Sequence, residues 1–573
     1  MHDGDKAALR ETPFQFTFFL KETIRTTQFL SAPALSPIFA SGSLYCGACA
    51  NEQRTGETMN SIVEALSCPE AYPHASGAVE VVETHISWIF LTGSFAYKVK
   101  KPLDLGFLDF STPEKRRHYC NEEIRLNRRL CPEIYLSVVP VVLAGESLLV
   151  DAPGDIVDYA VKMVQFDRAT ELDRMLSQQL LRVEHIDCLA TTIAGFHSSL
   201  PALPAESGFG HPDNLVKPML NNFTTIESII SDAHELNQIA LLQAFTRQEH
   251  RRLCPLLLKR ESDGFIRQCH GDLHTGNMVL WKERIVIFDC IEFNEALSNI
   301  DVISDLAFLF MDLEHGGESG LAWRLLNNYL AETGDFDALP LLRFYALYRA
   351  MVRAKVTAIR FSQSESQEAK RILEEHCSYI ARAQSYTCRQ KPMLILTFGV
   401  SGSGKTVFSR SIAEALRCVH IRSDIERKRL AGLKALERSE ENTSLYANDS
   451  SRKTYRRLLD LALLCIEAGI TVIVDATFLK GSNRRMFMAI AEAHHTPCRI
   501  LRFSAPDELL IERVRRRYQR GDDASEADTE VLRLQLEMQE ALTVEEEAIT
   551  FDIDSEQKVD ASAIALRLQS VTA

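Results

Sequence analysis

The hydrophobic pattern along the chain changes character near Phe166. Over residues 79–166, short apolar runs such as VEVVETHISWIFL, FAYKVKKP and DYAVKMVQF are separated by turn residues and predict β-strands. One helix is expected among them, over about 113–130, because STPE is a capping signal. After Phe166, apolar residues recur every three or four positions, as in HIDCLATTIAGFHSSL, and predict long amphipathic helices, which NMVLW and RIVIFDC interrupt as a hairpin. The pattern indicates a small antiparallel sheet with one helix against it, followed by a mainly helical region.

A second pattern begins after the polar stretch 362–391. MLILTFGV, CVHIRSD, TVIVDAT and CRILRFS are short apolar strands separated by helical sequence such as TVFSRSIAEAL. Strands that alternate with helices predict a parallel, doubly wound sheet. We therefore expect two unlike domains, at 58–388 and 392–573. They follow an extension over 1–57 that is rich in Ser, Thr, Ala and Gly and is expected to be disordered; whether Met59 is the true start is left open.

The composition is that of a globular protein with an acidic balance. The 573 residues are 46% hydrophobic and 25% charged, with a formal net charge of −14. This charge disfavours nucleic acid as a partner, because general nucleic-acid binders carry a basic footprint. No stretch reaches the roughly 18 uncharged apolar residues of a membrane span, and no basic segment precedes an apolar core at the start. We expect a cytoplasmic protein without membrane contact; the oligomeric state stays open.

GVSGSGKT, which follows the strand MLILTF and enters a helix, predicts a P-loop. In such a loop the backbone N–H groups cradle phosphates at the positive end of the helix. The lysine reaches the β- and γ-phosphates, and the hydroxyl of the next residue holds Mg²⁺. The residues concerned are Gly399, Gly402, Gly404, Lys405 and Thr406. No guanine-specific NKxD signal follows, so ATP is favoured over GTP.

HGDLHTGN marks a second, separate candidate site. Asp272 precedes Asn277 by five residues, and Asp289 ends the hairpin that follows. A loop carboxylate can orient and deprotonate an attacking hydroxyl, while an Asn and a second Asp can hold Mg²⁺ against ATP phosphates. The segment resembles the catalytic loop and metal-binding Asp of the aminoglycoside phosphotransferase-like kinases, in which HGD replaces HRD. The resemblance implies a protein-kinase-like α+β fold for the first domain.

The same resemblance extends upstream of the loop. Lys98, in FAYKVKKP, corresponds to the phosphate-gripping lysine, with Lys100 as the alternative two residues later on the same strand face. Glu123, or its neighbour Glu122, lies on the following helix, where such kinases place the acid that pairs with the lysine. The G-x-G-x-x-G motif of protein kinases is absent, so the sequence does not show how the triphosphate is covered.

For other polar residues of the first domain, a structural role and a functional role are both possible. Asp301 and Asp305 match a helix of the family in which an acid braces the catalytic loop, but ordinary acids at a helix N-terminus fit equally well. Arg349 and Arg353 share a helix face and could meet an anionic substrate. Such pairs are usually a solvated, salt-bridged face.

In the second domain, three features favour a small-molecule kinase among P-loop proteins. Asp424, with Arg427 one helical turn later, resembles the substrate-binding pair of gluconate-kinase-like, polynucleotide-kinase-like and zeta-toxin-like P-loop kinases, where the carboxylate contacts the accepting hydroxyl. Asp475, in VIVDAT, is a Walker B-like acid and a candidate ligand of Mg²⁺. The third feature is the run IERVRRRYQR, whose arginines can line one face as a phosphate-clamping lid: Arg513, Arg517 and Arg520.

The whole arrangement, over about 59–555, resembles a bacterial family in which an aminoglycoside phosphotransferase-like domain is fused to an AAA-annotated, zeta-toxin-like P-loop kinase. The resemblance implies two sites for ATP and Mg²⁺, each transferring a phosphoryl group to a small hydroxylated acceptor. Two alternatives remain open: the first domain is a silent ligand-binding regulator, or the second phosphorylates nucleic-acid 5′ ends. The sequence identifies neither acceptor and does not show whether the sites act in sequence.

Overall fold

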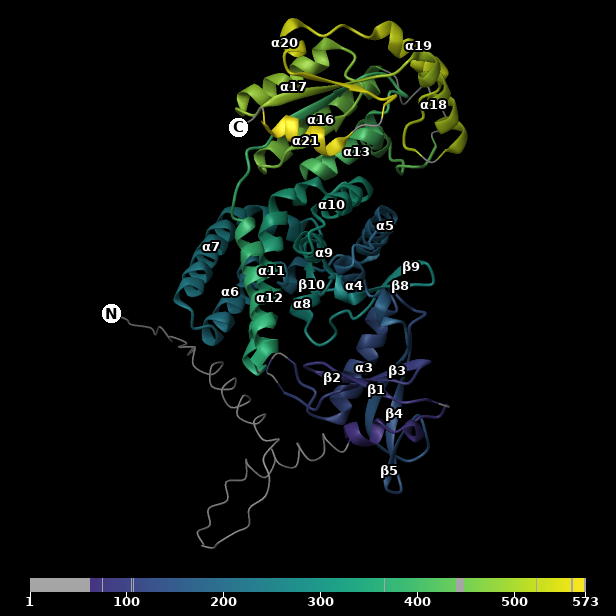
Figure 1. Ribbon diagram of the computed structural model, residues 1–573, viewed down its shortest axis with the longest axis vertical. Helices are drawn as coiled ribbons and strands as arrows, with labels where there is room; N and C mark the ends of the chain where they lie inside the picture. The colour runs from purple at the N-terminus through teal and green to yellow at the C-terminus, as the bar shows by residue number, and fades with distance from the viewer. Residues whose placement is uncertain are drawn as a thin grey trace, which may run out of the picture.

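The computed structural model describes residues 62–74, 76–104, 106, 108–364, 366–438, 448–521, 523–557 and 560–570. The expected extension over 1–57 lies outside these residues. Figure 1 shows two bodies stacked along the long axis of the molecule. The lower body holds an antiparallel sheet at its far end and a helical lobe above it, and the upper body is the C-terminal part of the chain.

The sheet of the lower body has six strands in the order β1-β2-β3-β6-β4-β5, with every neighbouring pair antiparallel. The elements of this lobe are η1 (Pro69–Ala71), β1 (Glu80–Glu83), β2 (Ser87–Leu91), β3 (Phe95–Lys100), α3 (Pro113–Asn127), β4 (Tyr135–Ala144), β5 (Ser147–Val150) and β6 (Asp155–Val164). Helix α3 begins where Thr112 accepts a hydrogen bond from Lys115 N and Pro113 occupies the first turn. It packs on β4 and β6, so one helix lies against the sheet.

The helical lobe is organised around α9 (Val302–His315), in which every residue from 302 to 314 is buried. Helix α9 packs against α10 and α11. The other helices of the lobe are η2 (Arg168–Thr170), α4 (Leu172–Ser177), α5 (Val183–Ser199), η3 (Ala205–Ser207), α6 (Pro212–Ile229), α7 (Ala233–Ser262), η4 (Thr275–Asn277), α8 (Glu295–Ser298), α10 (Ser319–Thr333), η5 (Phe336–Ala338), α11 (Leu339–Gln363) and α12 (Ser366–Ser385). Two short antiparallel pairs interrupt them: β7 (Ile266–Gln268) with β10 (Asn299–Asp301), and β8 (Met278–Trp281) with β9 (Arg284–Ile287).

The upper body is built on a five-stranded parallel sheet in the order β12-β13-β11-β14-β15. The strands are β11 (Leu394–Phe398), β12 (Val419–Arg422), β13 (Val472–Asp475), β14 (Cys498–Ser504) and β15 (Thr550–Asp554). The helices are α13 (Lys405–Leu416), α14 (Ser423–Leu430), α16 (Asn448–Glu467), α17 (Gly481–Ala493), α18 (Asp507–Arg520), α19 (Thr529–Met538), α20 (Val544–Glu547) and α21 (Ala561–Ser570). The parallel sheet agrees with the prediction, whereas β15 was not anticipated.

Helix α10 joins the two bodies, because it packs against α13 and β12 of the upper one (Figure 1). The side-chain amide of Asn327 donates to Cys418 O at 3.0 Å and accepts from His420 N at 2.9 Å. It therefore satisfies backbone groups along β12, which is an edge strand of its sheet. None of the helices among the described residues is long and apolar enough to cross a membrane.

The base of the helical lobe contains a buried ion-pair network. Arg260 on α7 makes two hydrogen bonds to Asp301, at 2.7 and 2.8 Å, and two to Asp335, at 2.7 and 2.8 Å. Its side chain is 1% exposed. Removing one partner of such a network leaves buried charges without compensation.

We therefore expect Arg260→Met to lower the free energy of unfolding of the first domain by about 3–5 kcal/mol. Arg252→Met is the matched control: Arg252 pairs with Glu249 on the same helix with its side chain 45% exposed, and such pairs contribute at most about 1 kcal/mol. All three tryptophans of the chain, Trp88, Trp281 and Trp323, lie in the first domain, so fluorescence during urea denaturation reports this domain alone. Equal midpoints for the two variants would contradict the expected role of the network.

Candidate active sites

The loop between β7 and β8 carries the first candidate site, and its backbone conformation depends on Gly271. The residue has a φ of 88°, and a Cβ there would lie 2.7 Å from Leu297 O, so only glycine fits. His270 donates from Nε2 to Phe288 O at 2.8 Å and so ties the loop to the segment that follows β9. The loop is thus a defined structure and not a flexible turn.

A buried carboxylate and a buried guanidinium hold this loop from the helical lobe. Asp305, in the first turn of α9, accepts hydrogen bonds from the backbone N–H groups of His270 at 3.0 Å and Gly271 at 2.9 Å. Arg349 on α11 donates to Gly271 O at 3.0 Å and to Ser304 O at 3.1 Å. Arg349 is 4% exposed, so it is neither the solvated residue nor the substrate contact that its helical spacing suggested. Asp301 instead binds Arg260, as described above.

Asp272 lies at the edge of the loop with about a third of its side chain exposed. Asn277 Nδ2 donates to Asp272 O at 3.0 Å and to Asp272 Oδ2 at 3.1 Å, and His274 Nε2 lies 3.3 Å from the same carboxylate oxygen. Burial would raise the pKa of Asp272, but His274, His270 and Arg353 outweigh it and hold the pKa below its usual range. Asp272 is therefore a carboxylate at neutral pH and can accept a hydroxyl proton.

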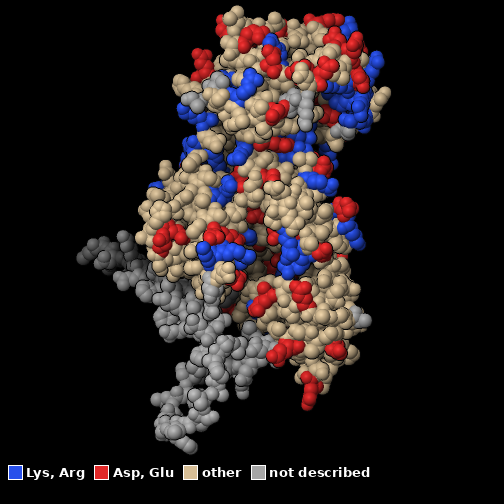
Figure 2. All heavy atoms as spheres, in the orientation of Figure 1, with Lys and Arg blue, Asp and Glu red and all other residues tan. Residues whose placement is uncertain are grey.

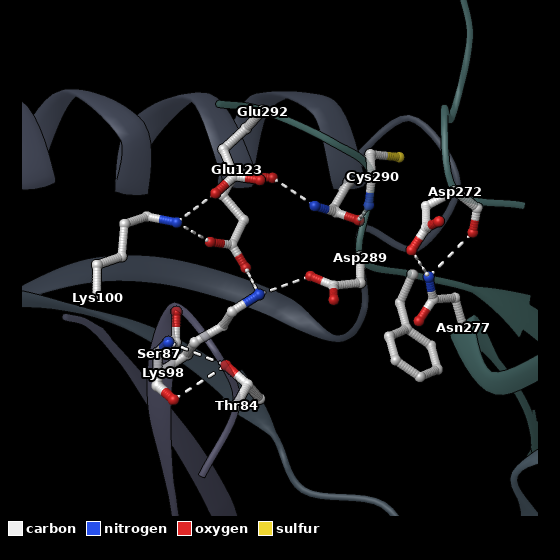
Figure 3. Close-up of polar contacts among 12 residues, drawn as sticks. Thr84, Ser87, Lys98, Lys100, Glu123, Asp272, Asn277, Asp289, Cys290 and Glu292 are labelled. Carbon is white, nitrogen blue, oxygen red and sulfur yellow. Dashed lines mark hydrogen bonds and ion pairs between the residues drawn. The ribbon is translucent and has the colours of Figure 1, made fainter. Parts of the chain in front are cut away.

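Two lysines share one buried glutamate on the other side of this site (Figure 3). Lys98 Nζ lies 2.9 Å from Glu123 Oε1 and 2.6 Å from Asp289 Oδ1. Lys100 Nζ lies 2.7 Å from Glu123 Oε2 and also pairs with Glu292. Burial and the opposing attraction of both lysines leave the pKa of Glu123 at about 2. Glu123 is therefore ionised and positions both ammonium groups.

The surroundings distinguish the two lysines. The side chains of Lys100 and Glu292 are 0% and 3% exposed, whereas that of Asp289, the partner of Lys98, is 42% exposed. Lys98 therefore faces the open side of the site and Lys100 the interior. Glu122, the alternative to Glu123, pairs with Arg125 on the surface of α3.

Asp289 adopts a left-handed backbone conformation, with a φ of 65°. This region is unfavourable for most residues but is comparatively well tolerated by Asp. The next peptide is held by a hydrogen bond from Cys290 N to Asn127 Oδ1 at 2.9 Å. The turn directs the Asp289 carboxylate toward Lys98 (Figure 3). Asn277 and Asp289 offer oxygen atoms, the ligand type that Mg²⁺ prefers, so the residues present fit this ion.

The second candidate site is the glycine-rich turn between β11 and α13. All three glycines have positive φ, and an added Cβ would lie 2.6 Å from Phe503 O at Gly399, 2.8 Å from Leu510 O at Gly402 and 2.8 Å from the Phe408 ring at Gly404. Side chains are thus excluded where the backbone N–H groups must approach phosphates. Lys405 donates to Val400 O at 2.7 Å. Its pKa is lowered to about 8, mainly by burial and further by Arg517.

Asp475 ends β13 beside the first turn of α13. It accepts from the Thr406 side chain and from His420 Nε2, the latter at 3.3 Å. Burial would raise its pKa, but His420, Lys405 and Thr406 lower it to about 2. A hydroxyl and an ionised carboxylate side by side are an oxygen ligand set that fits Mg²⁺.

Asp424 lies at the start of α14 and is bound by Arg427 Nη1 at 2.5 Å. Burial opposes ionisation, but Arg427, Arg517 and Arg422 hold the pKa of Asp424 below its usual value. In the predicted lid, Arg513 donates to Ser555 O at 2.8 Å and to Gly402 O at 3.3 Å, and Arg517 donates to Ala527 O at 3.1 Å. Both lid arginines are thereby held near the turn.

Most of the predicted site residues of the second domain line one cavity of about 1140 Å³. Gly399 lies beneath the turn and is not among its lining residues. The predicted residues that line the cavity are Gly402, Gly404, Lys405, Thr406, Asp424, Arg427, Asp475, Arg513, Arg517 and Arg520.

Comparison with known proteins identifies both halves of the chain. Residues 107–345 match the model of the phosphotransferase enzyme family, and residues 394–542 match the model of the AAA domain. The chain thus joins a phosphotransferase-family domain to an AAA-type P-loop domain. The predicted family resemblance and the predicted fold class are confirmed. Lys98 precedes the matched part of the phosphotransferase-family domain, so its role rests on geometry.

The curated relatives align with most of the chain, and the solved structures with one part of it. The uncharacterized protein Rv2004c of Mycobacterium tuberculosis (strain H37Rv) is 29% identical over 457 residues, which cover 78% of this chain and 88% of the relative. Among solved structures, a choline kinase from Cryptosporidium parvum aligns with 58% of this chain and 96% of its own at 10% identity and a TM-score of 0.35. A gluconokinase from Sinorhizobium meliloti aligns with 32% of this chain and 97% of its own at 22% identity and a TM-score of 0.24.

Several contacts of these sites were not predicted from the sequence. Glu292, three residues after Asp289, was not named, and Arg349 was named as a possible substrate contact and not as a residue that holds the loop. His420 was hidden in CVHIRSD, although strand alternation places it on the same face of β12 as Arg422, whose register partner is Asp475. Gln535 accepts from Ser401 N at 2.7 Å in the P-loop. Only His420 carried a usable local signal.

We expect Lys98→Met and Lys100→Met to have different consequences in the phosphotransferase-family domain. Both variants are made in a Lys405→Ala background, so that only the first domain keeps its candidate ATP-binding lysine. In this background, Lys98→Met should weaken ATP binding roughly 10- to 100-fold, because it removes a charged hydrogen-bond donor. Lys100→Met should instead lower the free energy of unfolding by about 3–5 kcal/mol, because it leaves Glu292 buried without a cation.

Titration calorimetry with ATP and tryptophan fluorescence in urea measure the two effects separately. A folded Lys100→Met variant that loses ATP affinity, beside a Lys98→Met variant that keeps it, would reverse the assignment. Lys162→Met on β6 is the control, because Lys162 pairs only loosely with Asp151, at 3.7 Å.

Proposed function

We propose that the chain is an ATP- and Mg²⁺-dependent phosphotransferase in which both domains transfer a phosphoryl group to a hydroxyl of a small molecule. One observation supports the proposal: each domain has an ionised carboxylate, a buried lysine and a pair of side chains that offer oxygen atoms. In the phosphotransferase-family domain these are Asp272, Lys98 and the pair Asn277 and Asp289. In the P-loop domain they are Asp424, Lys405 and the pair Thr406 and Asp475.

In the first domain, Asp272 would orient the acceptor hydroxyl and take its proton while the acceptor oxygen forms a bond to the γ-phosphorus. The bond from that phosphorus to the β–γ bridging oxygen breaks, and ADP leaves. Lys98 would move from Asp289 to the phosphates, since the ion pair between them places the ammonium group at the open side. Asn277 and Asp289 would hold Mg²⁺, which supplies charge neutralisation at the phosphates.

In the second domain, Asp424 would accept the proton of the acceptor hydroxyl, and the same bonds form and break. Lys405 would exchange Val400 O for the phosphates, while Thr406 and Asp475 hold the ion. Arg513 and Arg517 would neutralise charge that develops on the transferred group.

The alternative that the second domain acts on nucleic-acid 5′ ends is favoured by one observation, the many cations that line its cavity. The acidic chain as a whole does not provide the basic footprint that a polymer needs. Labelling of a 5′-hydroxyl oligonucleotide with ATP tests the alternative directly.

The proposal is tested by incubating the protein with ATP, Mg²⁺ and a cell metabolite extract and measuring phosphorylated products by mass spectrometry. We expect Asp272→Ala to remove one set of products and Lys405→Ala another, each with a loss of at least about 100-fold. A positioned base contributes about that much, and so does a positioned charge on the transferred phosphoryl group. Asp263→Ala, after α7 of the first domain, and Lys391→Ala, just before β11 of the second, are surface controls, because both residues are exposed.

Each outcome separates the two domains. Retention of every product and of ATP turnover in both variants would overturn the proposal. Loss in Lys405→Ala alone would leave the first domain as the silent regulator considered above.

A further inference from the structure

The cavity of the P-loop domain has a charge opposite to that of the chain. Ten Lys and Arg side chains line it against three Asp, although the chain has a formal net charge of −14. Figure 2 shows basic side chains gathered beside the upper body and along the waist between the two bodies. The cations are Arg324, Lys405, Arg410, Arg427, Arg452, Lys480, Arg513, Arg516, Arg517 and Arg520. Such an excess indicates anionic ligands.

ATP accounts for only some of these cations. Lys405 and the lid arginines of α18 gather at the glycine-rich turn, where the phosphates would lie. Arg410 lies elsewhere, one helical turn beyond Thr406 on the same face of α13. Arg324 on α10 and Arg427 on α14 line the same cavity from other elements. Arg427 binds Asp424, the residue proposed to meet the acceptor hydroxyl. Of these three cations, Arg427 is placed at the candidate acceptor residue, and Arg324 and Arg410 line the same cavity from α10 and α13.

Arg324 comes from the other domain and is held rigidly. It makes a bidentate pair with Asp187, at 2.6 and 2.7 Å, and donates to Glu414 of α13 at 2.6 Å. Asn327, one turn further along α10, is bonded to the backbone of β12. The phosphotransferase-family domain thus supplies one lining residue, Arg324, to the cavity of the P-loop domain.

Arg410 has no hydrogen bond or ion pair with any side chain or carbonyl among the described residues. Burial lowers its pKa, and the like charges of Arg422 and Arg324 lower it further; the carboxylates of Asp187 and Glu414, which pair with Arg324, oppose this shift only in part. Arg410 is thus a half-buried cation on the cavity lining whose guanidinium is available to pair with an anion. Guanidinium groups bind phosphate and carboxylate in a bidentate manner.

We propose that Arg410, together with Arg324 and Arg427, binds an anionic group of the acceptor, so that the P-loop domain phosphorylates a small hydroxylated molecule that already carries a phosphate or a carboxylate. The proposal rests on the proposed function, because it assigns Asp424 to the hydroxyl of the same molecule. The anion and the hydroxyl would then be fixed at separate points, and the site would be complete only with both domains present.

Three molecules with one carbon skeleton test the proposal: glycerol 3-phosphate, glycerate and glycerol. Each is titrated by calorimetry into the full chain saturated with Mg²⁺ and a non-hydrolysable ATP analogue, so that the γ-phosphate position is filled. We expect at least one of the two anions to bind about 10-fold or more tightly than glycerol, the effect of a single charged hydrogen-bonded pair. The tighter anion identifies phosphate or carboxylate as the group recognised.

Arg410→Gln should abolish this preference while the affinity for the ATP analogue stays within about twofold, and Arg324→Gln should reduce it. Arg410 has no hydrogen-bond or ion-pair partner in the described part of the chain, so we expect its substitution to spare the fold. Arg456→Gln is the control, because Arg456 is exposed on α16 and forms an exposed ion pair with Asp460. An anion preference that survives in both variants, or none in the parent, overturns the proposal, as does tighter binding of a 5′-hydroxyl oligonucleotide than of either anion.

A failure of the proposed function can be distinguished from a failure of this proposal. The analogue would then bind equally well to the parent and to Lys405→Ala, and the same three titrations on the chain without nucleotide would still decide the anion preference.

Discussion

The buried carboxylate of Asp305 is the interaction on which the geometry of the first site depends. Two consecutive backbone N–H groups of the loop between β7 and β8 donate to it, and the next residue, Asp272, lies at the edge of this loop. Because Asp305 lies on α9, which is buried along almost its whole length, the loop takes its position from the core of the helical lobe. Helix α9 packs on α10, and α10 in turn contacts the second domain. One pair of packed helices, α9 and α10, therefore contacts the loop of the first site through Asp305 and the second domain through α10.

The parts that the sequence predicts well are those encoded within a few consecutive residues. The glycine-rich turn and the catalytic loop have contiguous signatures, since their backbones must adopt conformations that few residues allow. Alternating strands and helices likewise indicated the parallel sheet, because the pattern reflects burial on both faces. Lys98 and Glu123 were located through their order along the chain, and the choice between Lys98 and Lys100 needed the exposure of their partners.

The rest depends on contacts between distant residues, which no local pattern records. Arg349 has the spacing of a solvent-facing helical residue, yet it is buried against a loop nearly eighty positions earlier. Glu292 and Arg324 are ordinary charged residues in the sequence, and only the packing of separate elements gives them partners. The net charge of the chain likewise did not predict the basic lining of the cavity, because a sum over all residues does not show where positive and negative side chains lie.

The contact of Asn327 with β12 matters when the P-loop domain is expressed without the first domain. An edge strand with free N–H and C=O groups is a template for pairing with other chains, and in this protein a side-chain amide from the first domain covers two of those groups. A P-loop domain expressed alone would present β12 uncovered, together with the apolar surface that α10 now protects. Self-association of the isolated domain would therefore result from the loss of the contacts that Asn327 and α10 make with β12, and would not imply a natural oligomer.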